Sequence, residues 1–402
     1  MIRHLLKPMW RRKGRNLLLS LELGLTFAVV FAIAATGLRY WQLYHSPVGF
    51  EWQDVWTVQL LMPDDSAIDP ALYGRYERAL LQLPEVESVA FAAYTPYENS
   101  EWNTDFVVDG SKRSIDSHLM KVSDGFFDTM GMKMVEGRAF SSVDEGAGEK
   151  PVLVNRRFAE EAFPGQSALG KIIRQDTRGE PGAGAQEGLK IVGVFDSFRN
   201  QGEFMAPKGF LFQRFSPMSN LPPPMRAMLL KVRPGTTRIF ETELSRRLKL
   251  VRNDASYSIS PMRDLRESQL RSATMPLVVL SVIAAFLLLM VAFGLFGVLW
   301  QNTTRRIPEL GLRRATGATA GDITRQIVLE QVLLCLLPIA GALILLVQLP
   351  ITGALGESLS WPLFAGAALL AIVVMVLVSV LCALYPAWRA SRLSPTEALH
   401  YE

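Results

Sequence analysis

Residues 275–300 read MPLVVLSVIAAFLLLMVAFGLFGVLW, and residues 301–318 read QNTTRRIPELGLRRATGA. The first stretch holds no charged residue over 26 positions, whereas about 20 apolar residues suffice to cross a hydrocarbon core ~30 Å thick. The second stretch holds four arginines and one acid, Glu309. An uncharged span followed at once by a basic loop is typical of a membrane protein, so this region decides the fold.

Three further stretches have the same character. Residues 17–38, 327–349 and 363–386 are long and mostly apolar, in a chain of 402 residues that is 49% hydrophobic with a mean hydropathy of +0.19. Together with 275–300 they predict an α-helical membrane domain of four transmembrane helices. The first of them contains a charge, Glu22. An ionisable residue inside a span is either a functional site or a side chain that reaches the nearby interface or packs against a neighbouring helix.

The basic residues predict the orientation of these helices. Short loops rich in Lys and Arg remain in the cytoplasm. The amphipathic N-terminal segment 1–16 and the loop 301–326 are basic, whereas the short connection 350–362 holds only one charged residue, Glu357. We therefore expect a multi-pass membrane protein with both termini, including the tail 387–402, in the cytoplasm, and residues 39–274 on the outer side. A cleaved signal peptide is disfavoured, because an apolar segment of about 22 residues exceeds the usual h-region.

The distribution of charge also indicates contact with a membrane. The net charge is +4 and the pI is about 9.0, but the basic residues flank the apolar segments. This arrangement predicts contact with the lipid bilayer and no nucleic-acid partner.

Motifs for chemistry are missing from the sequence. The two cysteines, Cys335 and Cys382, lie in apolar segments, and the four histidines are scattered, so neither a disulfide framework nor a metal site is predicted. The sequence contains no G-x-x-x-x-G-K-[ST] loop and no G-x-S-x-G elbow. We therefore expect no catalytic, cofactor-binding or metal-binding residue, and a chain that is not an enzyme.

The long connection 39–274 predicts a large α+β domain. Two strand–helix–strand units, 50–97 and 224–266, suggest a ferredoxin-like βαβ pair with an inserted β-rich lobe at 98–223. The helical faces are Leu72, Tyr76, Leu80 and Leu83 in the first unit and Phe240, Leu244, Leu248 and Val251 in the second. Asp69 is the expected cap of the first helix and Thr236 or Thr237 that of the second. In the lobe, strands are expected at 106–108, 152–154 and 190–195.

Three segments together resemble the MacB and FtsX family of ABC-transporter permeases, the type VII architecture. Residues 304–318, TRRIPELGLRRATGA, resemble the pattern R-x-x-E-I-G-x-R-R-A-x-G-A, and residues 385–399, YPAWRASRLSPTEAL, resemble Y-P-A-x-x-A-x-x-x-x-P-x-x-A-L. VSDGFF at 122–127, FPG at 163–165 and IVGV at 191–194 are similar to the MacB-like periplasmic core domain. The resemblance runs through nearly the whole chain and implies a bacterial inner-membrane permease whose large domain is periplasmic.

The resemblance implies that the basic loop is a short coupling helix that docks into an ATPase. The coupling residues would be Arg305, Arg306, Glu309, Gly311, Arg313, Arg314, Ala315, Gly317 and Ala318. The arginines would pair with acidic groups of the ATPase or with lipid phosphates, Leu310, Leu312 and Ala315 would supply a packing face, the helix would begin near Pro308, and Gly317 would end it. The alternative is a plain positive-inside loop. The C-terminal motif residues are Tyr385, Pro386, Ala387, Arg392, Pro395, Ala398 and Leu399.

The resemblance also implies partners. In MacB an ATPase domain precedes the first helix, whereas only the segment 1–16 precedes it here, so ATP and Mg are expected on a separate ABC ATPase chain. A second permease, identical or paralogous, is expected, and a periplasmic adaptor is a further candidate partner. The expected function is mechanotransmission that drives efflux of a peptide, antibiotic or other amphiphile from the periplasmic side. The alternatives are a lipoprotein-releasing permease and an FtsX-like activator of a periplasmic enzyme.

Overall fold

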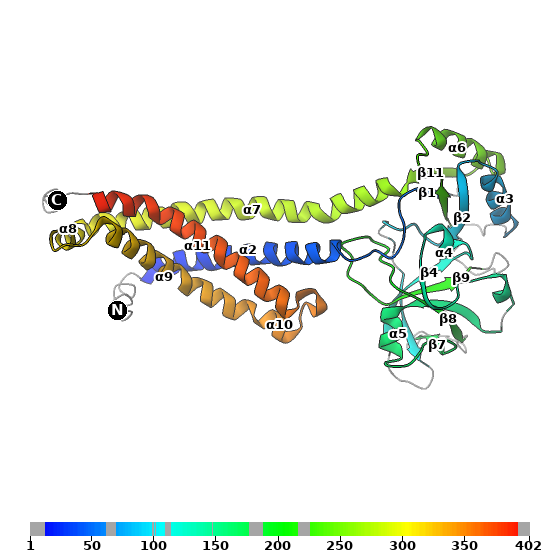
Figure 1. Ribbon diagram of the computed structural model, residues 1–402, viewed down its shortest axis with the longest axis horizontal. Coiled ribbons are helices and arrows are strands. Elements are labelled where there is room, and N and C mark those ends of the chain that lie inside the picture. Colours follow the sequence, from blue (N-terminus) through cyan, green and yellow to red (C-terminus); the bar gives the residue numbers. More distant parts are fainter. Residues whose placement is uncertain are drawn as a thin grey trace. The chain divides into compact units, whose positions relative to one another are not determined.

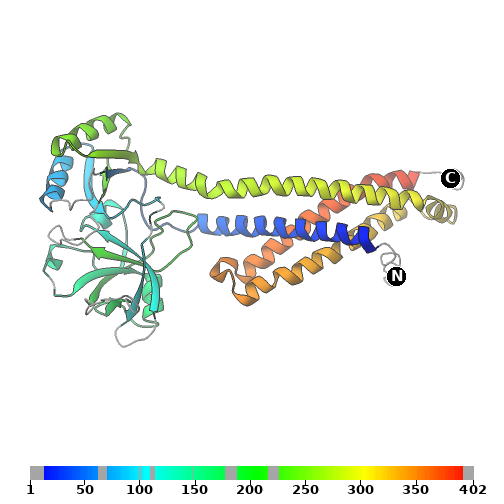
Figure 2. The same cartoon turned by 180° about the vertical axis from the view of Figure 1, so that it is seen from behind.

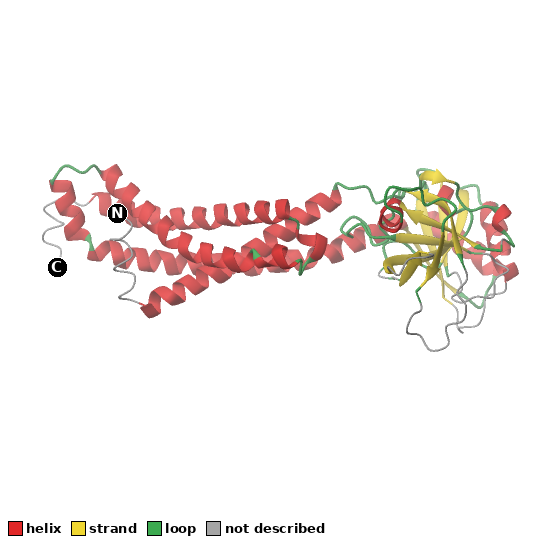
Figure 3. Ribbon diagram, turned by 90° about the horizontal axis from the view of Figure 1, so that it is seen from below, coloured by secondary structure: helices red, strands yellow, loops and turns green. Residues whose placement is uncertain are grey.

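The computed structural model describes residues 13–61, 70–98, 100, 102–108, 114–146, 148–176, 188–215 and 226–392. The chain divides into two compact units. One comprises the residues up to Gln42 and those from Thr274 onward, and the other comprises Leu43–Ala273. Figure 3 shows that the strands belong to the second unit, whereas the first is helical.

Four long apolar helices dominate the first unit (Figure 1). They are α2 (Lys13–Tyr44), α7 (Met262–Arg305), α9 (Ala320–Leu346) and α11 (Trp361–Arg392), and α2 and α7 each continue into the second unit. Each predicted span overlaps one of them, and all four are long and apolar enough to cross a membrane. At 1.5 Å per residue the 44 residues of α7 extend about 66 Å, about twice the thickness of a hydrocarbon core.

Short elements connect these helices. The helix α8 (Ile307–Ala315) lies between α7 and α9, and α10 (Gln348–Thr352) with the 3₁₀ turn Gly356–Leu359 lies between α9 and α11. The fourth span extends past its predicted end at 386 and includes Pro386 within the helix. Its last turns are held by packing, because Ala387 and Ala390 are buried in a small apolar cluster.

The helices pack through bulky and small side chains together. Leu23, Phe27 and Phe31 of α2 belong to one buried cluster with residues of the other three helices. On α11 the buried residues of this cluster include Ala367 and Ala371, whose side chains are fully enclosed. Small residues let helix backbones approach closely, which is how membrane helices gain packing contact without a hydrophobic driving force. Large apolar side chains such as Phe286 and Leu377 are exposed on the outer faces of these helices.

The second unit is built on a mixed sheet of eleven strands (Figure 2). The strands are β1 (Val55–Leu61), β2 (Val86–Ala92), β3 (Asn103–Val108), β4 (Ser114–Val122), β5 (Met134–Gly137), β6 (Lys150–Asn155), β7 (Ile172–Gln175), β8 (Leu189–Phe195), β9 (Phe210–Arg214), β10 (Ala227–Val232) and β11 (Ser256–Pro261). The helices are α3 (Pro70–Leu81), α4 (Phe126–Thr129), α5 (Arg156–Ala162) and α6 (Ile239–Val251), with a 3₁₀ turn at Ser142–Asp144.

The two predicted strand–helix–strand units interleave in one part of the sheet. Its order is β11-β1-β10-β2, and every neighbouring pair is antiparallel. The helices α3 and α6 pack on one face through the predicted apolar residues, of which Leu80, Leu244 and Leu248 are fully buried. The cap prediction for α6 is wrong: Arg238 occupies the N-cap position, and the Thr236 hydroxyl donates instead to the Arg233 carbonyl at 2.7 Å. Asp69 lies outside the described residues.

The inserted lobe is a closed ring of strands, which the sequence did not predict. The pairings run β4-β3-β7-β8-β6-β9, and β9 pairs back onto β4 in parallel. The three expected strands lie within β3, β6 and β8. One residue pair, Ala92 with Val122, joins β2 of the four-stranded part to β4 of the ring. The predicted boundary between subdomain and lobe is therefore crossed by a single continuous sheet.

A buried arginine fixes the loop between β8 and β9 to the chain that follows α2. Arg199 is 1% exposed and donates to five backbone carbonyls: Leu43 at 3.1 Å, Pro47 at 3.2 Å, Glu203 at 2.9 Å, Met205 at 3.3 Å, and Ser46. We call this group the Arg199 site. Carbonyls at a helix end lack partners in the helix, and a cation there is favoured by the helix dipole. In the same loop, Glu203 pairs with Arg266 of α7 at 2.5 Å.

Candidate functional site

The helix α8 begins where the chain leaves α7. Arg306 has a non-helical backbone conformation and precedes α8 as its N-cap residue, and Pro308 lies in the first turn, where a missing N–H has no consequence. Glu309 lies in the first turn and Arg313 and Arg314 in the last, so these charges match the helix dipole. The prediction that a helix begins near Pro308 is confirmed to within one residue.

The turn between α8 and α9 is closed by backbone and side-chain hydrogen bonds. Gly317 has φ of +104°, and Gly317 and Ala318 donate their N–H groups to the carbonyls of Arg314 and Arg313, at 3.1 and 3.0 Å. This pattern is a Schellman motif, which requires a left-handed residue. Thr319 then forms a capping box with Asp322, at 3.2 and 3.1 Å, and α9 begins at Ala320. We call α8, this turn and α9 up to Glu330 the elbow.

An ion-pair network connects the two helices of the elbow. Arg306 contacts Glu309 at 3.2 Å and Glu330 at 2.6 Å, and Arg313 contacts Glu309 at 2.9 Å and Gln326 at 2.6 Å. Gln326 in turn donates to Glu330 at 2.9 Å. The hydrogen bond from Arg306 holds the pKa of the Glu309 carboxyl below its usual value. The network therefore fixes the direction of α8 relative to α9.

This network changes the expectation for the coupling arginines. Arg306 and Arg313, which were expected to pair with a partner or with lipid, are engaged with carboxylates of their own chain. Arg305 is exposed, and Arg314 is half-buried and also has contacts within the chain. The arginines thus divide into a structural pair and a pair that lies at the two ends of α8.

The predicted packing face of α8 is wrong in one respect. Leu310 is buried with Ile307 and Gly311, whereas Leu312 is 59% exposed and Ala315 is also exposed. Positions 310 and 312 are about 200° apart on a helix, so they cannot share a face. The inward face of α8 is therefore Ile307, Leu310 and Gly311, and its outward face carries Leu312 and Ala315. Gly317 is exposed in the turn, and Ala318 is half-buried.

The structure brings the C-terminal motif against the elbow. Ala387 and Ala390 of α11 are buried in one apolar cluster with Leu310 of α8 and Ile323 and Ile327 of α9. Pro386 is buried, whereas Tyr385 and Arg392 are exposed on the same helix. Pro395, Ala398 and Leu399 lie outside the described residues. The two motifs, about 70 residues apart in the sequence, thus form one site.

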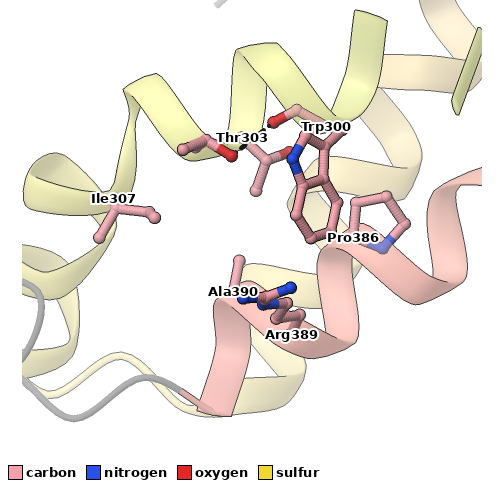
Figure 4. A pocket seen from close by; sticks show the side chains of 7 residues that line it. Trp300, Thr303, Ile307, Pro386, Arg389 and Ala390 are labelled. Atoms are coloured by element: carbon pink, nitrogen blue, oxygen red, sulfur yellow. Dashed lines mark hydrogen bonds between the residues drawn. The ribbon is translucent and has the colours of Figure 1, made fainter. Parts of the chain in front are cut away.

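A small cavity of about 40 Å³ lies between α7, α8 and α11 (Figure 4). It is lined by Trp300, Thr303, Thr304, Ile307, Pro386, Arg389 and Ala390. The Arg389 guanidinium lies over the Trp300 ring, 4.7 Å from its centroid. Three residues of the site were not predicted from the sequence: Arg389, Gln326 and Glu330. Glu330 carried a signal, because it is a carboxylate inside the predicted span 327–349.

Glu22 does not belong to this site. It lies on α2 beside the buried Leu23, is half-buried, and has no ion pair with another residue whose side chain the structure describes. Its predicted role therefore stays open. Within the described part of the chain there is also no group of three His, Cys, Asp or Glu residues that could hold a metal ion.

Two family models match the chain. The model of the MacB-like periplasmic core domain matches residues 21–243, more than half of the chain, and that of the FtsX-like permease C-terminal region matches residues 281–395. The chain belongs to the MacB and FtsX family of ABC transporter permeases. The elbow, the cavity and α11 all lie within or directly beside the FtsX-like match.

Curated relatives of this permease are named as MacB proteins or as an ABC transporter permease. The macrolide export ATP-binding/permease protein MacB of Syntrophobacter fumaroxidans is 25% identical over 352 residues, which cover 74% of this chain and 49% of that protein. The uncharacterized ABC transporter permease YknZ of Bacillus subtilis is 24% identical over 305 residues, which cover 71% of this chain and 70% of that protein. The permease spans about half the length of the MacB relatives it matches.

Solved structures of periplasmic domains resemble part of the permease. The periplasmic region of MacB from Actinobacillus actinomycetemcomitans aligns with a TM-score of 0.39 at 13% identity, covering 56% of this chain and 97% of that one. The extracellular domain of YknZ from Gram-positive bacteria aligns with a TM-score of 0.34 at 16% identity, covering 51% and 99%.

Proposed function

We propose that this permease is the membrane subunit of an ATP-driven export system that works by mechanotransmission. The observation that carries the proposal is the elbow: α8 is fixed to α9 by the Arg306–Glu330 pair and to α11 by a buried apolar cluster. A helix anchored in this way can pass a displacement to the spans, whereas a flexible loop could not.

The outward face of α8 is the proposed docking surface. Leu312 and Ala315 are exposed there, between the exposed Arg305 at one end and Arg314 at the other. An apolar centre with charged residues around it is the usual composition of a protein interface. The partner is a separate ABC ATPase that binds ATP and Mg, and the working unit contains a second permease, identical or paralogous.

The proposed location follows from the charge distribution. The elbow with Arg305, Arg313 and Arg314 lies in the cytoplasm, both termini are inside, and residues 43–273 form the periplasmic domain of an inner-membrane protein. The substrate is a peptide, antibiotic or other amphiphile taken from the periplasmic side, and an adaptor protein is a candidate partner there. We assign the four strands β11-β1-β10-β2, with α3 and α6, to a ferredoxin-like arrangement on the basis of their order and pairing.

The docking surface is tested by Leu312→Glu in the full chain, co-expressed with the ABC ATPase that co-purifies with the unaltered chain. A carboxylate buried at an interface without a partner costs several kcal/mol, so we expect loss of ATPase co-purification and of ATPase stimulation. The matched control is Leu250→Glu, an exposed leucine on α6, which should leave both unchanged. If the Leu312→Glu permease retains the ATPase as the control does, α8 is not the docking helix.

A further inference from the structure

A row of four aromatic side chains joins α7 to α11 at the elbow. Phe296 and Trp300 stack at 6.1 Å, Trp300 and Tyr385 at 6.2 Å, and Tyr385 and Trp388 at 6.3 Å between ring centroids. We call these residues the aromatic row. Tryptophan and tyrosine favour the membrane–water interface, because their rings are apolar and carry a polar group.

Two arginines stack on this row. Arg389 lies over Trp300 at 4.7 Å and Arg392 over Trp388 at 4.4 Å. Both are exposed, and neither forms an ion pair with a carboxylate among the residues that the structure describes. A cation–π contact orients a guanidinium without neutralising its charge. The two arginines therefore present fixed positive charges that are available to an anion.

Exposed apolar side chains lead along both helices to the aromatic row. On α7 they are Phe286, Leu289 and Phe293, and on α11 they are Leu377, Leu381 and Leu384. Spacings of three and four residues place each set on one helix face. Acyl chains contact apolar faces of this kind. The α7 face leads to Trp300, on which Arg389 stacks, and the α11 face leads to Trp388, on which Arg392 stacks.

The cavity supplies space and polar groups beside Arg389. Its volume of about 40 Å³ holds roughly three water-sized spheres, which is about the size of a phosphate group. Figure 4 shows Trp300, Thr303, Pro386 and Arg389 around it. Thr303 is 8% exposed, and the Thr304 hydroxyl donates to the Trp300 carbonyl at 2.8 Å. The Arg389 guanidinium at the rim can donate to phosphate oxygens in a planar, bidentate geometry.

We propose that Arg389, Arg392 and the aromatic row bind the phosphate of an anionic phospholipid whose acyl chains lie along α7 and α11. Basic pockets between membrane helices are suited to anionic headgroups. A lipid explains the apolar faces and the charges together, whereas an acidic segment of a partner protein would explain only the charges. The proposal depends on α7 and α11 spanning a membrane and not on α8 docking an ATPase.

The test uses the full-length chain in detergent, titrated with dioleoylphosphatidylglycerol or dioleoylphosphatidylcholine, with bound lipid counted by native mass spectrometry. We expect Arg389→Gln with Arg392→Gln to weaken phosphatidylglycerol binding about tenfold or more, because two charge-assisted contacts are lost. Trp300→Leu keeps both charges and should weaken binding about threefold through loss of stacking. The matched control is Arg325→Gln, which removes an exposed arginine at the start of α9 and should change binding less than about twofold.

Four results would overturn the proposal. One is equal phosphatidylglycerol affinity in the double variant and the Arg325→Gln control. Another is equal binding of the zwitterionic and the anionic lipid. A third is unchanged lipid binding with loss of ATPase co-purification in the double variant, which would assign the arginines to a protein partner. Displacement of the lipid by millimolar inorganic phosphate would assign the site to free phosphate instead.

Discussion

The Arg199 site and the elbow both depend on arginines, but these arginines differ in burial and in the groups that they contact. Arg199 is 1% exposed and contacts five backbone carbonyls, whereas Arg306 and Arg313 are 37% and 46% exposed and contact carboxylates. Burial lowers the pKa of Arg199, although a guanidinium remains protonated in proteins. Water cannot reach a buried cation to replace a lost hydrogen-bond partner, whereas it can replace either partner of an exposed ion pair.

The two sites contribute to different properties of the protein. The Arg199 site determines whether the loop between β8 and β9 stays folded, so its loss should appear as lost stability. The elbow determines the direction of a helix, so its loss should appear mainly as lost coupling. Three substitutions separate these effects, and a fourth, Asp144→Asn, tests a buried carboxylate elsewhere in the domain.

The largest effect is expected at the Arg199 site. Arg199→Ala removes the guanidinium donor from five backbone carbonyls, and three of these contacts, with Leu43, Glu203 and Met205, are buried, so the change should cost about 3–5 kcal/mol of unfolding free energy. The measurement is denaturant unfolding of the purified chain, followed by the β-sheet circular dichroism signal. Arg246→Ala, at an exposed pair with Glu243, should leave the stability essentially unchanged, because exposed ion pairs contribute little. Similar losses in both variants would mean that burial of Arg199 does not matter.

The same loop can be displaced without removing a charge. Gly49 has φ of +93°, and a Cβ there would lie 1.8 Å from the Ser197 carbonyl oxygen. We expect Gly49→Ala to cost about 2–4 kcal/mol, through backbone strain and displacement of Ser197. Gly235→Ala, at φ of +87° with no atom within 4 Å, should cost only about 1 kcal/mol. An equal cost in both variants would show that the chain moves away from Ser197 without loss of stability.

An intermediate effect on stability is expected when the buried carboxylate of Asp144 is replaced. Its two oxygens accept from Arg138 at 2.7 and 2.5 Å, and this contact lowers the pKa of Asp144. A depressed pKa means that the stabilisation is complete above about pH 5 and is lost as the pH falls through the folded-state pKa. Asp144→Asn should cost about 1–2 kcal/mol at neutral pH and should flatten the acid side of the stability profile. An unchanged acid slope in the variant would contradict the assignment.

The smallest effect on stability is expected in the elbow. Glu309→Gln removes the carboxylate shared by Arg306 and Arg313, and because these groups are half-exposed the cost should be below about 1 kcal/mol. The expected loss is in ATPase stimulation, measured with the co-expressed ATPase in proteoliposomes. The comparison fails if Glu309→Gln unfolds the chain as readily as Arg199→Ala does.

The apolar patterns of the sequence predicted much of this architecture. The four long helices follow from long, mostly apolar runs, and the buried faces of α3 and α6 follow from residues such as Leu80 and Leu244 at helical spacing. Within the elbow, the Glu309–Arg313 pair has the i,i+4 spacing that predicts contact. These features depend on residues close in the sequence.

Features that depend on distant residues were not predicted. Arg199 contacts carbonyls more than 150 residues earlier in the chain. Because every residue has a backbone carbonyl, the sequence cannot indicate which carbonyls a buried arginine contacts. Closure of the ring requires β9 to pair with both β4 and β6, which no local period specifies. The Arg306–Glu330 pair joins two helices across a turn, so only the fold brings these side chains together.

The closed ring of strands also determines how this domain would respond to a pulling force. A ring has no terminal strand, so strands cannot be peeled from it one after another, and several rows of hydrogen bonds must break at once. The four-stranded part is different, because β11 pairs only with β1 and is followed directly by α7 at Met262. In a single-molecule pulling experiment through α7, β11 should therefore unzip first and at low force, and the ring should rupture last in a single high-force event.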